Sequence, residues 1–87
     1  MIDKLIENYI SNININDIIN FANKNKTFIT NDEANIIYNC IKDNWYTLIH
    51  NNPNNIFNNL KQKLNNETYN KCIEMYNYYK TKYKDYL

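Results

Sequence analysis

The sequence contains no glycine at any of its 87 positions. Phosphate-binding loops and dinucleotide-binding turns need glycine, because they use positive φ angles and let the backbone approach the ligand closely. Both kinds of nucleotide site are therefore excluded in their standard form. Arginine is absent too, so no planar guanidinium can hold a phosphate through two parallel hydrogen bonds.

Residues that ligate metals or act as nucleophiles are scarce. The chain has one histidine, His50, and two cysteines, Cys40 and Cys72, too few for a closed tetrahedral zinc site. Cys40 and His50 fall on one expected helix, about 15 Å apart along its axis, and Cys72 could reach His50 only through tertiary packing. We expect two free, half-buried thiols, no metal, no cofactor and no enzymatic activity.

Asparagine, by contrast, makes up almost a quarter of the chain. Together with abundant isoleucine, lysine and tyrosine, and without arginine, valine or glycine, it indicates codons poor in G and C, as in a low-GC bacterium. An asparagine-rich chain can also be disordered. Here isoleucine, leucine and tyrosine recur at regular intervals through the asparagines, which favours a folded protein.

The apolar residues follow the period of an α-helix over most of the chain. One stripe runs from Ile2 to Ile13, and further stripes predict helices at about residues 15–24, from Thr30 to His50, through Ile56 to Leu64, and from Asn66 onward. We therefore predict an all-α, bundle-like fold of four to five short helices, forming a single domain over residues 1–87. The residues expected to be buried include Ile18, Ile19, Ala22, Ala34, Ile37, Ile41, Trp45, Leu48, Ile49, Leu60 and Tyr76.

Several helix starts carry recognisable capping residues. Asn14 and Asp17 supply a side-chain acceptor followed by an acid in the first turn. Thr30 and Glu33 have the spacing of a capping box, in which each side chain bonds the other residue's backbone amide. Phe28 and Ile29, just before this box, are expected to pack on the new helix. Asn66 is the expected cap of the last helix.

The stretch D43-N-W-Y-T-L-I-H-N-N-P53 contains the only tryptophan, histidine and proline. Trp45 falls on the apolar stripe, which favours core packing over ligand stacking. His50 falls in the last turn, near unpaired carbonyl groups, and Pro53 suits the first turn of the next helix. We interpret the stretch as a corner between two helices, and take Thr30, Glu33, Trp45 and Pro53 as structural anchors.

Two binding surfaces can be considered. The first is an apolar face left over beside the main stripes, with Ile10, Ile15, Ile36 and Tyr38, suited to a protein partner or to self-association. The second is the C-terminal run of lysine and tyrosine, where Tyr78, Lys80, Lys82 and Lys84 could contact single-stranded nucleic acid. A net charge of +1 provides no strong attraction to nucleic acid or to anionic membranes.

The N-terminal residues carry acids among the apolar side chains, unlike a signal peptide or a membrane span. We therefore expect a cytoplasmic protein. The leading hypothesis is a non-enzymatic interaction or structural module, and the alternative is a weak nucleic-acid-binding protein.

The segment I13-N-I-N-D-I-I-N-F-A-N-K-N-K-T-F-I-T-N-D-E-A34 resembles the opening of a family of small Firmicute proteins, the domain-of-unknown-function family 2624. The matching positions are Ile13, Asp17, Ile18, Ile19, Ile29, Thr30 and Ala34, and I56-F-N-N-L60 is also similar. Thr27 and Phe28 replace the hydrophobic residue and proline usual there. The resemblance covers most of the chain from Ile13 to about Tyr76. It implies a small helical cytoplasmic protein without known catalytic residues.

Overall fold

The structure is a computed structural model, and it describes residues 2–82. Five helices follow one another along these residues: α1 (Ile2–Asn12), α2 (Ile15–Lys24), α3 (Asn31–His50), α4 (Asn54–Lys63) and α5 (Asn66–Lys82). The all-α prediction is confirmed. Within this range, no helix is both long enough and apolar enough to cross a membrane.

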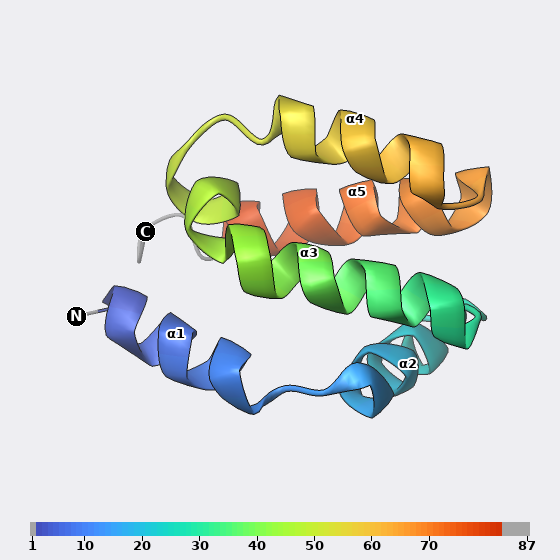
Figure 1. The fold of residues 1–87 in the computed structure, drawn as a ribbon, viewed down its shortest axis with the longest axis horizontal. Coiled ribbons are helices and arrows are strands. Elements are labelled where there is room, and N and C mark those ends of the chain that lie inside the picture. Colours follow the sequence, from blue (N-terminus) through green and yellow to red (C-terminus); the bar gives the residue numbers. More distant parts are fainter. Residues whose placement is uncertain (1, 83–87) are drawn as a thin grey trace.

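The long helix α3 occupies the centre of the arrangement. It contacts α1, α2 and α4, and α4 in turn contacts α5. Figure 1 shows α1 and α2 on one side of α3, with α4 and α5 on the other. The helices α3 and α5 run in the same direction, and α4 runs in the opposite direction (Figure 1).

Both predicted caps are present at the starts of α2 and α3. The Asp17 amide donates to Asn14 Oδ1 over 3.0 Å, and the Asn14 amide donates to Asp17 Oδ2 over 2.9 Å. At α3, the Glu33 amide donates to Thr30 Oγ1 over 3.0 Å, and the Thr30 amide donates to Glu33 Oε1 over 3.2 Å. Each box satisfies amides that a helix start would otherwise leave unpaired.

The end of α2 forms a left-handed turn without glycine. Lys26 has a φ of 59°, a conformation that glycine usually supplies at this position. The Thr27 amide donates to the Ala22 carbonyl over 2.9 Å, and the Lys26 amide donates to the Asn23 carbonyl over 3.0 Å. These two bonds are the Schellman pattern, so the strained residue is stabilised by the last carbonyls of α2.

Three local predictions are corrected. Phe28 is 91% exposed instead of packing on α3; neighbouring side chains in an extended segment point opposite ways, and buried Thr27 and half-buried Ile29 take the inward positions. Pro53 is the N-cap of α4, one residue before its first turn. The cap of α5 is Asn65, whose Oδ1 accepts from the Thr68 amide over 2.8 Å, because Asn66 is already the first helical residue.

The buried side chains of the described residues gather where α3 and α5 begin and α4 ends. They are Ala34, Leu60, Leu64, Thr27, Glu33 and Thr68. The other apolar residues of the α2 and α3 stripes, including Ile18, Ile19, Ala22, Ile37, Ile41, Leu48 and Ile49, are only half-buried. Of the residues expected to be buried, only Ala34 and Leu60 are, so the core is confined to one end of the bundle.

Trp45 is also half-buried, which corrects its expected place in a central core. Its ring meets that of Tyr46 edge-on, with the ring centroids 5.7 Å apart. Trp45 thus lies on α3 with part of its surface in water, and its role as an anchor stays a prediction.

Two hydrogen bonds join α3 to α5 directly. Glu33 Oε2 accepts from the Asn65 amide over 3.3 Å, near the start of both helices. Further along, the Tyr76 hydroxyl donates to the Leu48 carbonyl over 2.6 Å. Glu33 thus caps α3 with one carboxylate oxygen and holds the cap residue of α5 with the other.

Replacing Glu33 with alanine should destabilise the protein by about 2 kcal/mol, because it removes the acceptor of two partly buried hydrogen bonds, from the amides of Thr30 and Asn65. Asp32→Ala is the matched control, since Asp32 is an exposed acid in the same helical turn and should cost at most about 0.5 kcal/mol. Urea denaturation of both variants measures the difference. An equal decrease in the free energy of unfolding of the two variants would contradict the proposed role of the Glu33 carboxylate.

Candidate functional site

An apolar groove with a volume of about 360 Å³ lies between the helices. Its walls come from all five helices and from two connections. The lining residues are Tyr9, Ile10, Ile13, Asp17, Ile18, Phe21, Ala22, Asn25, Thr27, Ile29, Ile37, Cys40, Ile41, Leu48, Phe57, Leu60, Thr68, Lys71, Cys72, Met75 and Tyr76. We call this space the apolar groove.

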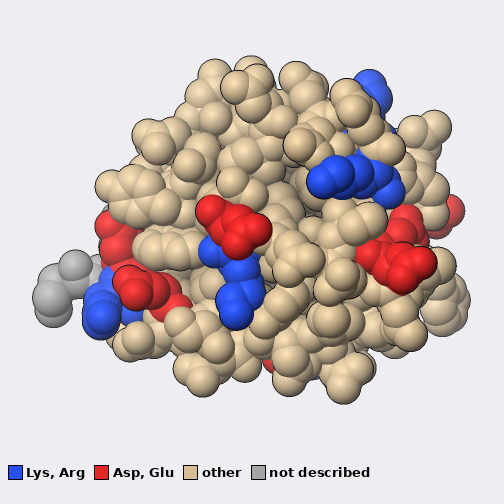
Figure 2. Space-filling view, viewed as in Figure 1, with Lys and Arg blue, Asp and Glu red and all other residues tan. Residues whose placement is uncertain are grey.

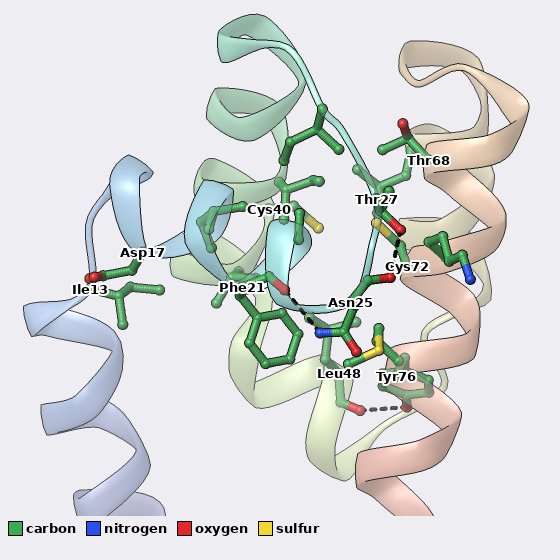
Figure 3. Close-up of a pocket in the computed structure, with 18 of the residues that line it drawn as sticks. Ile13, Asp17, Phe21, Asn25, Thr27, Cys40, Leu48, Thr68, Cys72 and Tyr76 are labelled. Carbon is green, nitrogen blue, oxygen red and sulfur yellow. Dashed lines mark hydrogen bonds between the residues drawn. The ribbon is translucent and has the colours of Figure 1, made fainter.

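The groove exists because α2 and α5 flank α3 without filling the space between them. Figure 3 shows side chains of α2, α3 and α5 converging on this space, with Phe21 on one side and Tyr76 on the other. Two of the lining aromatic residues remain open to water, since Tyr9 is 69% exposed and Phe21 is 42% exposed. The groove therefore opens to solvent beside α1 and α2.

The polar atoms around the groove are occupied by internal bonds. Thr27 Oγ1 donates to the Asn25 carbonyl over 3.3 Å, and Asn25 Nδ2 donates to the Phe21 carbonyl over 2.9 Å (Figure 3). Among the side chains that the structure describes, no buried nitrogen or oxygen lacks a hydrogen bond. The groove thus presents mainly carbon and sulfur to an occupant.

Both thiols lie in this groove. Cys40 comes from α3 and Cys72 from α5, and neither is in a disulfide. Burial raises the pKa of the Cys72 thiol to about 11, helped by the nearby Cys40 and Glu33. Burial also raises the pKa of Cys40, partly offset by a hydrogen bond with Asn44. Both groups are therefore neutral thiols at pH 7.

The single histidine lies outside the groove. His50 Nε2 is 2.6 Å from Asp3 Oδ1, which ties the end of α3 to the start of α1. Its ring also contacts that of Tyr46, with centroids 4.6 Å apart. The sequence predicted only that His50 lies at the end of a helix. It gave no sign of the pairing with Asp3, because the two residues are 47 positions apart in the chain. Neither His50, Trp45 nor Pro53 lines the groove.

Two lysines near the end of α5, Lys80 and Lys82, each lie over a tyrosine ring. Tyr78 is 56% exposed, and Lys82 Nζ lies 5.6 Å from the centre of its ring. Lys80 Nζ donates to the Tyr76 hydroxyl over 2.9 Å and lies above the same ring. Lys84 lies outside the described residues. On the face drawn in Figure 2, acidic and basic residues are interspersed and most of the surface is uncharged.

The leftover apolar face differs from the prediction. Ile10, Ile15, Ile36 and Tyr38 are all half-buried, and of these Ile10 lines the groove. The prominent exposed residues include Leu5 at 66% and Tyr9 at 69%, which the helical period had assigned to a buried stripe. A single sequence marks the apolar face of a helix, but cannot say whether a neighbour covers it.

Among the described residues, no group of three or more His, Cys, Asp and Glu side chains is placed to hold a metal ion. Comparison with known proteins gave no match to a family model, to a curated protein or to a solved structure. The resemblance at Ile13–Ala34 stays a prediction. Functional inference therefore rests on the groove itself.

The two thiols offer a direct test of the groove's environment. A thiol reacts through its thiolate, and a pKa of about 11 leaves Cys72 with roughly 100-fold less thiolate at pH 7 than a thiol of ordinary pKa. Iodoacetamide should therefore alkylate Cys72 slowly in the folded chain and quickly in urea, with the folded rate rising steeply above pH 9. Mass spectrometry of the peptides measures each site. A folded rate at pH 7 equal to that in urea would contradict the buried position.

Proposed function

We propose that this protein is a non-enzymatic interaction module of the cytoplasm whose apolar groove binds an amphipathic helix of a partner protein. The observation that carries the proposal is an open groove with apolar walls from all five helices. A helix that inserts an apolar face into such a groove gains free energy from burying that face. The free state of Cys40 and Cys72 suits a reducing compartment.

The apolar surface extends beyond the groove along α1. Tyr9 lines the groove, and Leu5 lies one turn earlier on the same face of α1, since residues four apart are neighbours on a helix. Both side chains are about two-thirds exposed. A small molecule filling 360 Å³ would leave Leu5 in water, whereas a helix lying along the groove would cover it. The extent of the surface therefore favours a helical partner.

The charges at the groove define the partner further. Asp17 lines the groove from α2 and Lys71 from α5, on opposite sides of the space between these helices. Asp17 already accepts from the Asn14 amide, and Lys71 pairs with Glu74 over 3.7 Å. A complementary helix with a basic residue toward Asp17, an acidic residue toward Lys71 and apolar residues between them would compete with these internal partners. Such edge charges select orientation more than they add affinity.

A second candidate function is weak binding of single-stranded nucleic acid through Tyr78, Lys80, Lys82 and Lys84. The exposed ring of Tyr78 and its neighbouring lysines support this candidate. Base stacking would compete with Lys82 for that ring, and Lys80 is already bonded to Tyr76. We therefore rank it below the helix-binding function.

The test is a selection from a displayed library of amphipathic helical peptides of about four turns, followed by fluorescence polarisation with the selected peptides. We expect the wild-type protein to bind them and the Tyr9→Asp, Phe21→Asp double variant to bind at least tenfold more weakly, because two charges would stand at the groove. Phe28→Asp is the control, since Phe28 is exposed but does not line the groove. Circular dichroism verifies that each variant is helical.

Unchanged affinity in the folded double variant would overturn the groove as the binding site. A library that yields no binder, while a small apolar fluorophore occupies the groove, would favour a small-molecule ligand. Titration with single-stranded oligonucleotides at two salt concentrations covers the second candidate, because binding that neutralises phosphates weakens as salt is added.

A further inference from the structure

The two cysteines of this chain are brought together by the fold. Cys40 on α3 and Cys72 on α5 both line the apolar groove, and Figure 3 shows them on facing helices. Burial is the main cause of the raised pKa of Cys72, and the charge of Cys40 adds to it, in line with their shared position at the groove. These two residues, 32 positions apart in the sequence, thus line the same apolar groove.

The register of the two helices explains this proximity. Glu33 on α3 bonds the amide of Asn65 at the start of α5, so these two residues face each other. Cys40 follows Glu33 by seven residues and Cys72 follows Asn65 by seven residues. Seven residues are about two helical turns, and α3 and α5 run in the same direction. Each cysteine therefore lies about two turns beyond the Glu33–Asn65 bond, at a similar height along its helix.

A second hydrogen bond joins the same two helices beyond the thiols. The hydrogen bond from the Tyr76 hydroxyl to the Leu48 carbonyl lies further along both helices than Cys40 and Cys72. The thiols are thus held between two polar links. The groove lies beside them, and both thiols line it.

We propose that Cys40 and Cys72 are a redox-active pair, which forms a reversible disulfide joining α3 to α5 and closing the apolar groove to its partner helix. The disulfide is assigned from the geometry of the two helices, and the effect on the partner rests on the proposed function. The bond draws together α3 and α5, two of the helices whose side chains line the groove, and so narrows the space that the apolar face of the partner helix would enter.

The oxidant is a low-molecular-weight disulfide such as glutathione disulfide. The Cys40 thiolate attacks one sulfur of the oxidant, forming a mixed disulfide and releasing one small thiol. Cys72 loses its proton, and its sulfur attacks Cys40 Sγ, which forms the internal disulfide and releases the second small thiol. The two protein thiols are oxidised by two electrons and one glutathione disulfide is reduced. Cys40 attacks first because Asn44 and Lys63 offset part of the effect of burial on its pKa.

The test incubates the full chain with glutathione disulfide, traps remaining thiols with iodoacetamide, and identifies the products by mass spectrometry. We expect a monomer whose mass is lower by two hydrogens, with Cys40 linked to Cys72 in the peptide map, and dithiothreitol should restore the original mass. The melting temperature should rise, since the bond restricts the unfolded chain. Cys72→Ser should stop at a single glutathione adduct on Cys40, whereas Cys40→Ser should form an adduct much more slowly, because the raised pKa of Cys72 leaves little thiolate.

Stable glutathione adducts on the wild-type chain, or cross-linked dimers without an internal bond, would overturn the disulfide. Its effect on the groove is measured with the selected peptides, which should bind the oxidised protein at least tenfold more weakly than the reduced protein. Equal binding by the two forms would overturn the closure. The Cys40→Ala, Cys72→Ala double variant should bind equally well with and without oxidant. If no peptide binds even the reduced protein, the helix-binding function fails while the mass measurement still decides the disulfide.

Discussion

The carboxylate of Glu33 is the interaction on which the arrangement of this protein depends. One oxygen accepts from the Thr30 amide and completes the cap of α3, and the other accepts from the Asn65 amide at the cap of α5. A largely buried carboxylate is costly unless its oxygens are bonded, so its position is fixed by both partners at once. The register between two helices far apart in the sequence follows from this one side chain.

The rest of the fold is organised around that end. Ala34, Leu60, Leu64 and Thr68 are buried beside Glu33, while the remaining apolar stripes of α2 and α3 are only half covered. A chain of 87 residues buries a modest share of its surface even when well packed. Here the apolar surface that is not spent on the core borders a groove, and the exposed apolar side chains of α1 continue it. The same small set of apolar residues thus has to form both the core that stabilises the fold and the surface that could bind a partner.

Much of the secondary structure could be predicted from the sequence, because it depends on residues close together in the chain. The boxes formed by Asn14 with Asp17 and by Thr30 with Glu33 required only a spacing of three residues, and both are present. The sequence predicted Asn66 as the cap of α5, whereas the cap is Asn65, one position earlier. Such an error is typical where neighbouring asparagines could each cap the helix.

The groove could not be predicted, because it depends on how helices face one another. Helical periodicity placed Tyr9 on an apolar stripe, yet no neighbour covers that side chain. The second oxygen of Glu33 and the pairing of His50 with Asp3 join residues 32 and 47 positions apart, and nothing local marks them. The proximity of Cys40 and Cys72 likewise became visible only once the register of α3 and α5 was known.

Hydrogen exchange at the Asn65 amide tests this organisation most directly. Asn65 is an exposed residue in a short connection, where an amide would normally exchange with solvent in the fast range. Because its amide bonds Glu33, we predict exchange as slow as that of the amides within α5, and a large increase in rate in the Glu33→Ala variant. Fast exchange in the wild-type protein, matching that of Phe28, would contradict the central role of Glu33.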